Sequence, residues 1–136
     1  MASIGSHQAW AKTLELQDLG FESFPGFDVQ FFGGGECLIE LMEFRGGDPT
    51  VDARVERHGG GLHHLAFGVP DVVAALADAA ARSLDLIGHV HGPGARGTMI
   101  GFVDPHEPDV TFVEFVQDRP GDSTRPVRGP RRVAAA

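Results

Sequence analysis

Two stretches of this sequence decide the fold: CLIELMEF at residues 37–44 and TFVEFVQ at residues 111–117. Each is predicted to form a buried strand that is apolar on both faces and has a glutamate at its centre, Glu40 in the first and Glu114 in the second. An ionised carboxylate buried in this way costs several kcal/mol unless a cation, a metal ion or strong hydrogen-bond donors meet it. Two glutamates in equivalent places therefore indicate a duplicated unit whose halves direct carboxylates to a shared site.

The composition is that of one globular domain. The chain has 136 residues, of which 42% are hydrophobic and 22% charged, and these are ordinary values for a folded protein with a single core. Its single cysteine, Cys37, excludes an internal disulfide and is expected to be an inert, buried residue. The sequence shows neither a leader segment nor a membrane span, so we expect a cytoplasmic protein with no membrane partner.

Charge is distributed unevenly along the chain. Residues 1–117 contain 6 basic and 17 acidic residues, a net charge of −11, whereas residues 118–136 contain 5 basic and 2 acidic residues, a net charge of +3. The acidic part argues against a nucleic-acid partner. We expect residues 118–136 to be a disordered tail rich in proline and arginine, with a basic binding arm as the alternative.

The same order of elements is predicted in both halves of the chain, which indicates an α+β protein. The first half is predicted to contain a helix over residues 7–19, stopped by Gly20, strands over 21–24, 29–32 and 37–44, and a helix over 51–58. The second half is predicted to contain a strand over 62–69, a helix over 71–82, strands over 84–87 and 98–104 separated by a loop over 89–97, and a strand from residue 110. The first half lacks an opening strand, because only residues 1–4 precede its helix.

His64 is the histidine most suited to a functional role. Alternation along residues 62–69 places it on the face that carries only small neighbours, so its ring is predicted to point onto an open surface. The large residues of the opposite face are predicted to pack against the helix; they are Leu65, Phe67 and Val69. His63 falls on that crowded face, where a packed or capping role is expected.

His64, Glu40 and Glu114 together favour a metal site. A hydrogen-bonded core histidine is the simpler interpretation of His64 alone. One metal site, however, would explain why three polar side chains are buried at a cost in free energy. Imidazole and carboxylate ligands suit Co, Ni, Mn, Zn or Fe, and the mixture alone does not choose among them.

Several motifs make the chain resemble the vicinal oxygen chelate superfamily, also called the glyoxalase/bleomycin resistance/dioxygenase fold, and within it the methylmalonyl-CoA epimerases. Residues 58–117 match in order, and residues 7–57 match loosely, chiefly through 19–21 and 39–41. The matching motifs are HGGGLHHLAF at 58–67, VPD at 69–71, GARG at 94–97, FVDP at 102–105 and VEF at 113–115.

The resemblance implies a single domain over residues 1–117, built from two βαβββ modules at about 1–57 and 58–117 that form a cleft around one divalent metal. Carried over by position, the ligands would be His64, Glu40 and Glu114. The family's remaining histidine lies on the strand that the first module lacks, and His7 is a poor substitute. Three explanations stay open: a strand encoded further upstream, a site of three protein ligands plus water, or a metal-free binding cleft.

The resemblance also implies an activity, the epimerisation of a malonyl-type acyl-CoA by proton transfer. Glu114 would transfer one proton, while the second base is unassigned because the nearest acids, Glu22 and Asp28, are out of register. Arg96 would contact the anionic CoA or be a solvated loop residue. The alternatives are a metal-free small-molecule binding protein and a glyoxalase- or dioxygenase-type enzyme.

The missing strand has a consequence for assembly. A first module without it exposes a sheet edge, and an uncovered edge is an aggregation hazard. We therefore expect a homodimer.

Overall fold

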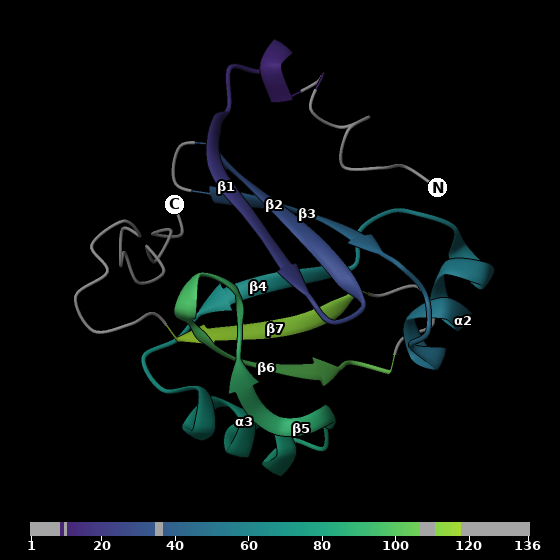
Figure 1. The fold of residues 1–136 in the computed structure, drawn as a ribbon. Coiled ribbons are helices and arrows are strands. Elements are labelled where there is room, and N and C mark those ends of the chain that lie inside the picture. The colour runs from purple at the N-terminus through teal and green to yellow at the C-terminus, as the bar shows by residue number, and fades with distance from the viewer. Residues whose placement is uncertain (1–8, 10, 35–36, 107–110, 118–136) are drawn as a thin grey trace, which may run out of the picture. The chain divides into compact units, whose positions relative to one another are not determined.

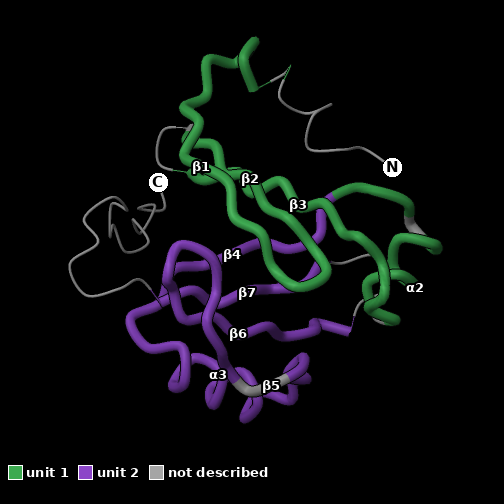
Figure 2. Tube along the Cα trace, in the orientation of Figure 1, with its two compact units in different colours: residues 1–61 green, residues 62–136 purple. Residues whose placement is uncertain are grey.

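A computed structural model describes residues 9, 11–34, 37–106 and 111–117. The chain forms two compact units, Met1–Gly61 and Leu62–Ala136 (Figure 2). The described elements, in chain order, are β1 (Gln17–Phe24), β2 (Phe27–Gly34), β3 (Cys37–Phe44), α2 (Pro49–His58), β4 (His64–Gly68), α3 (Val72–Ala81), β5 (Asp85–Pro93), the 3₁₀ turn η1 (Ala95–Gly97), β6 (Met99–Asp104) and β7 (Phe112–Gln117) (Figure 1). None of the described helices has the length and apolar character needed to cross a bilayer.

Unit 1 contains an antiparallel sheet of three strands in the order β1-β2-β3. The central strand β2 carries the buried apolar residues of this sheet, Val29, Phe31 and Phe32, because it is paired on both sides. At the β1–β2 turn the ring of Phe27 stacks on Phe24, with ring centroids 5.0 Å apart, and lies 5.6 Å from the ring of Phe44. These aromatic contacts fix one end of the sheet across all three strands.

Unit 2 has the order β-α-β-β-β that the sequence predicts, folded as a four-stranded sheet in the order β4-β7-β6-β5. The last strand, β7, lies between β4, to which it is parallel, and β6, to which it is antiparallel (Figure 1). The helix α3 begins at the N-cap Asp71, whose side chain accepts a hydrogen bond from Ala74 N–H at 3.0 Å. The core of the unit forms between this helix and one face of the sheet, around Val72, Leu76, Ala79 and Val103.

The strand β4 does not pack as the sequence predicts. Leu65 and Phe67 are paired with Val113 and Phe115, which contact the core, so they lie on the predicted face. However, α3 packs mainly on β5, β6 and β7. Strand β4 lies at the edge of the sheet, where this helix does not cover it. Leu65 and Phe67 are therefore 49% and 52% exposed, while Val69 alone of the three large residues packs against the core.

The predicted helix over residues 7–19 is wrong at its C-terminal end. Within the described residues, the helix includes residues 11–13, and β1 starts at Gln17. Gly20 is not a helix stop but part of a bulge in β1, with φ of +109°, where its N–H donates to the Asp18 carboxylate at 2.9 Å. His7 lies outside the described residues.

Two other predictions need correction. Part of the predicted loop over residues 89–97 belongs to β5, which continues to Pro93 through a register shift between Ile87 and Gly92. Cys37 is exposed, and none of the residues of β3 is fully buried, because β3 is at the edge of its sheet. The predicted helix over 71–82 and the strand over 98–104 are confirmed by α3 and β6.

The close packing of α3 on β6 gives a direct test. Gly101 is buried on β6, and a Cβ atom added to it would lie 2.5 Å from Leu76 Cδ1 and 3.0 Å from Cδ2. We expect Gly101→Ala to lower the free energy of unfolding by about 1–3 kcal/mol, because Leu76 must leave its position. Urea denaturation measures the change. Gly92→Ala on β5 is the control, since no atom lies within 4 Å of its added Cβ; equal stabilities for the two variants would contradict this packing.

Candidate metal centre

His64 and Glu114 meet on one face of the sheet in unit 2. His64 is the first residue of β4, and Glu114 lies in the middle of β7, directly opposite Ala66. Because alternate residues of a strand share a face, His64, Ala66 and Glu114 lie on the face opposite to Val113 and the core. The small side chain of Ala66 leaves room for the other two, and His64 Nε2 is 3.4 Å from Glu114 Oε2.

The two side chains are well shielded from water. Each is 8% exposed, and among the described residues every buried side-chain nitrogen or oxygen has a hydrogen-bond partner. A separation of 3.4 Å is long for an N–H···O hydrogen bond. By contrast, two ligand atoms about 2.0–2.2 Å from one tetrahedral metal ion lie roughly 3.4 Å apart. The residue types and the spacing therefore fit a shared divalent metal.

Aromatic rings hold the two histidines in place. The ring of His64 packs edge-to-face on Phe102, with centroids 5.5 Å apart, and Phe102 pairs with Glu114 in the sheet. The ring of His63 packs in the same way on Phe112, also at 5.5 Å. His63 is therefore packed as predicted, but the predicted face is wrong, because Phe112 pairs with His64 and lies on the face of Glu114 rather than on that of Leu65 and Phe67. His63 Nδ1 lies 3.0 Å from His64 Nδ1, a contact that strand alternation does not predict. The adjacency of the two histidines in the sequence could have indicated this contact.

Glu40, the third predicted ligand, belongs to unit 1. It is the fourth residue of β3, is half-buried and lies opposite Phe31 of β2. Its part in a metal site with His64 and Glu114 stays a prediction.

Arg96, the predicted substrate contact, lies in η1 between β5 and β6. It is half-buried and has a positive φ of 57°, an uncommon backbone conformation for a residue other than glycine. Such conformations require support from the surrounding structure. Its contact with a substrate stays a prediction.

Asp28, one of the two acids considered as a second base, is already engaged within unit 1. Hydrogen bonds from Arg45 and from the Ser23 hydroxyl, the latter at 2.6 Å, lower the pKa of the Asp28 carboxyl below its ordinary value. Arg45 also donates to the Phe24 carbonyl oxygen, so its position is fixed by the backbone. A carboxylate held in this way is a weak proton acceptor. Glu22, the other candidate, is half-buried on β1 opposite Val29.

The lowered pKa of Asp28 predicts a specific pH dependence of stability. A group whose pKa is lower in the folded state stabilises the fold above its unfolded pKa of about 3.9, and this contribution is lost as pH falls through the folded pKa. We expect the melting temperature of Asp28→Asn to fall less than that of the wild type between pH 5 and pH 2. The control is Asp78→Asn, which removes the exposed pair Asp78–Arg82 on α3. An identical acid response in Asp28→Asn and the wild type would contradict the effect.

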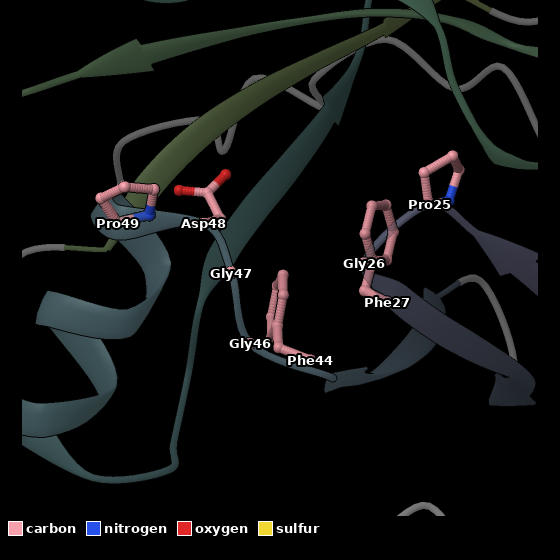
Figure 3. A pocket seen from close by; sticks show the side chains of 8 residues that line it. All are labelled: Pro25, Gly26, Phe27, Phe44, Gly46, Gly47, Asp48 and Pro49. Atoms are coloured by element: carbon pink, nitrogen blue, oxygen red, sulfur yellow. The ribbon is translucent and has the colours of Figure 1, made fainter.

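Unit 1 also contains a hollow of about 430 Å³. Figure 3 shows that the rings of Phe27 and Phe44 and the carboxylate of Asp48 border it. The residues that line it are Pro25, Gly26, Phe27, Phe44, Gly46, Gly47, Asp48 and Pro49. Asp48 accepts a hydrogen bond from Val51 N–H at 3.2 Å at the start of α2. None of the predicted metal ligands lines this hollow. The evidence for a metal centre therefore comes from His64 and Glu114.

Residues 6–102 match the family described as the Glyoxalase/Bleomycin resistance protein/Dioxygenase superfamily. The chain belongs to this superfamily. The resemblance inferred from the motifs around His64 and Glu114 is thereby confirmed at the level of the superfamily, and the α+β fold is the glyoxalase-like one.

Individual proteins show how far the likeness extends. The chain is 33% identical over 95 residues to the uncharacterized protein YqjC of Bacillus subtilis (strain 168), a match that spans 68% of this chain and 66% of that protein, just under two thirds of its length. The hypothetical protein BH1468 from Bacillus halodurans C-125 has a TM-score of 0.78 at 27% identity, covering 88% of this chain and 89% of the other. Methylmalonyl-CoA epimerase from Mycobacterium tuberculosis has a TM-score of 0.76 at 18% identity, covering 88% and 83%. This last likeness shows the shared fold alone.

Proposed function

We propose that this superfamily member is a metal-dependent epimerase of a malonyl-type acyl-CoA. The observation that carries the proposal is the buried pair of His64 and Glu114, whose facing atoms are 3.4 Å apart. An imidazole and a carboxylate at this distance suit a divalent metal better than they suit a hydrogen bond. The metal would be Co, Ni, Mn, Zn or Fe.

Glu40 is the third ligand in this proposal. Its support comes from the equivalence of the two sheets. Glu40 is on β3, the last strand of its sheet in chain order, which pairs with the preceding strand β2. Glu114 is on β7, which likewise pairs with the preceding strand β6. Catalytic metal sites commonly combine three protein ligands with a water molecule.

The chemistry proposed is proton transfer at the α-carbon of the thioester. His64, Glu114 and Glu40 would hold the divalent metal, which would supply Lewis-acid polarisation of the substrate's oxygens. The Glu114 carboxylate takes the proton from the α-carbon. A second acid, which is unassigned, delivers a proton to the opposite face of that carbon. Asp28 is a poor choice for that second acid because Arg45 and Ser23 lower its pKa. Arg96 is proposed to bind the anionic CoA.

The substrate class is supported by the likeness of fold to methylmalonyl-CoA epimerase, a protein whose name states its substrate. The adjacent strands β4 and β7 carry His64 and Glu114, so a metal bound by His64 would lie beside a carboxylate able to transfer a proton. An acyl-CoA is a metabolite of the cell interior, so the cytoplasmic location expected from the sequence is part of the same proposal.

A metal-free binding protein of the same fold is the second candidate. It is favoured by one observation: in the described part of the chain, buried side-chain polar atoms are all partnered without a metal. In that case His64 and Glu114 would satisfy each other as an ion pair, and the protein would bind small molecules without turnover.

Metal content and proton exchange decide between the two candidates. We expect about one divalent ion per chain in the wild type, measured by elemental analysis after purification and reloading. His64→Ala and Glu114→Gln should lose most of this metal, because each removes a ligand. The wild type should also incorporate deuterium from solvent at the α-position of methylmalonyl-CoA, followed by mass spectrometry.

The matched control is His106→Ala. The His106 side chain is 54% exposed and pairs with Asp85, so its loss should leave both metal content and exchange unchanged. A wild type that binds none of Co, Ni, Mn or Zn would overturn the metal-dependent epimerase and support the binding protein. Metal binding without deuterium exchange would overturn the substrate assignment.

We also propose that the protein is a homodimer that uses the β4 edge of unit 2. The exposed apolar residues of this region are Leu62, Leu65, Phe67 and Val73, with exposures of 63%, 49%, 52% and 50%. An apolar edge strand in water favours pairing with another chain. A second copy would cover this edge strand and its exposed apolar side chains.

Light scattering during size exclusion tests the dimer. We expect a dimer for the wild type at micromolar concentration and a monomer for Phe67→Glu, because the added charge would be buried at the interface. Leu14→Glu is the control, as it introduces the same charge at a 63% exposed apolar residue of unit 1. A monomeric wild type would contradict the homodimer, and an equal response of both variants would contradict the assignment to β4.

A further inference from the structure

We infer that His63 is a positioning residue that holds His64 in the tautomer whose Nε2 is able to bind the metal. This inference rests on the proposed metal site and assigns it a further residue. The observation behind it is the distance of 3.0 Å between His63 Nδ1 and His64 Nδ1. At this distance one nitrogen donates a hydrogen bond and the other accepts it.

In the proposed metal-bound state, the other nitrogen of His64 gives the direction of this hydrogen bond. His64 Nε2 faces Glu114 Oε2, so Nε2 is the atom that would share a metal with this carboxylate. A metal-binding nitrogen must offer its lone pair, which places the proton of a neutral imidazole on Nδ1. His64 Nδ1–H then donates to His63 Nδ1, and His63 carries its own proton on Nε2.

The structure holds His63 in the position that this role requires. Its ring packs edge-to-face on Phe112, at an interplanar angle of 76°. Its carbonyl oxygen accepts a hydrogen bond from Phe112 N–H at 3.2 Å. Phe112 is on β7, two residues before Glu114, so one strand fixes both the acceptor for His64 Nδ1 and the carboxylate opposite Nε2.

The alternative tautomer shows why this matters. If His63 offered no acceptor, the proton of His64 would move to Nε2 and donate toward Glu114. A metal ion would then have to displace this proton before binding. Loss of an outer partner of a metal-binding histidine typically weakens metal affinity about 10–100-fold, and we expect a change of this size.

Two substitutions separate this role from simple packing. His63→Phe keeps a ring against Phe112 but removes the acceptor. His63→Asn removes the ring but can place a carboxamide oxygen near the position of Nδ1. Long-range ¹H–¹⁵N NMR of the metal-free protein reports which nitrogen of His64 is protonated, and titration with Zn²⁺ against a competing chelator gives the affinity.

In the wild type and His63→Asn we expect the His64 proton on Nδ1 and similar Zn²⁺ affinities. In His63→Phe we expect it on Nε2 and a 10–100-fold loss of Zn²⁺ affinity, with unchanged thermal stability. Unchanged tautomer and affinity in His63→Phe would overturn the inference, as would equal losses in both variants. Failure of the wild type to bind Zn²⁺ would overturn the metal site instead, and the tautomer measured in the metal-free protein would still test the His63–His64 hydrogen bond.

Discussion

The parallel register between β4 and β7 is the constraint on which the rest of the site depends. It places Ala66 directly opposite Glu114 and leaves His64 two residues earlier on the same face. A slip of one residue would turn Glu114 toward the core formed with α3 and leave His64 without a carboxylate partner. The register is itself fixed by the apolar residues of the other face, since Val113 and Phe115 must reach that core. Core packing on one face of the sheet therefore fixes the positions of His64 and Glu114 on the other face.

Much of unit 2 could be predicted from the sequence because its signals are local. Alternation alone places His64 and Ala66 on one face, and Pro-Asp before an apolar run marks the start of α3. The exposure of Leu65 and Phe67 could not be predicted in this way. It depends on the order of strands in the sheet, which puts β4 at the edge, and alternation carries no information about which strand pairs with which.

Unit 1 was harder to predict for a related reason. Residues of high helix propensity precede Gly20, yet β1 begins at Gln17 because pairing with β2 outweighs local preference. The contact of His63 with His64 was missed because neighbours within a strand point to opposite faces. His63 precedes β4 and is free of that alternation, so its ring can turn toward His64. The second acid of the proposed reaction was unassigned from the sequence, and Asp28, one of the two nearest acids considered, is held by Arg45 and Ser23, which lower its pKa.

The central position of β7 also constrains how unit 2 is made. Because β7 lies between β4 and β6, the sheet is incomplete until β7, the last of the described strands, has left the ribosome. Until then β4 has no partner within its own sheet, and the apolar residues that β7 later covers remain accessible to chaperones or to other chains. Glu114 arrives on that last strand, 50 residues after His64, and such distant contacts form slowly. His64 and Glu114, two of the residues proposed to hold the metal, are thus brought together only when β7 joins the sheet. A metal ion that needs both ligands would bind only the completed sheet.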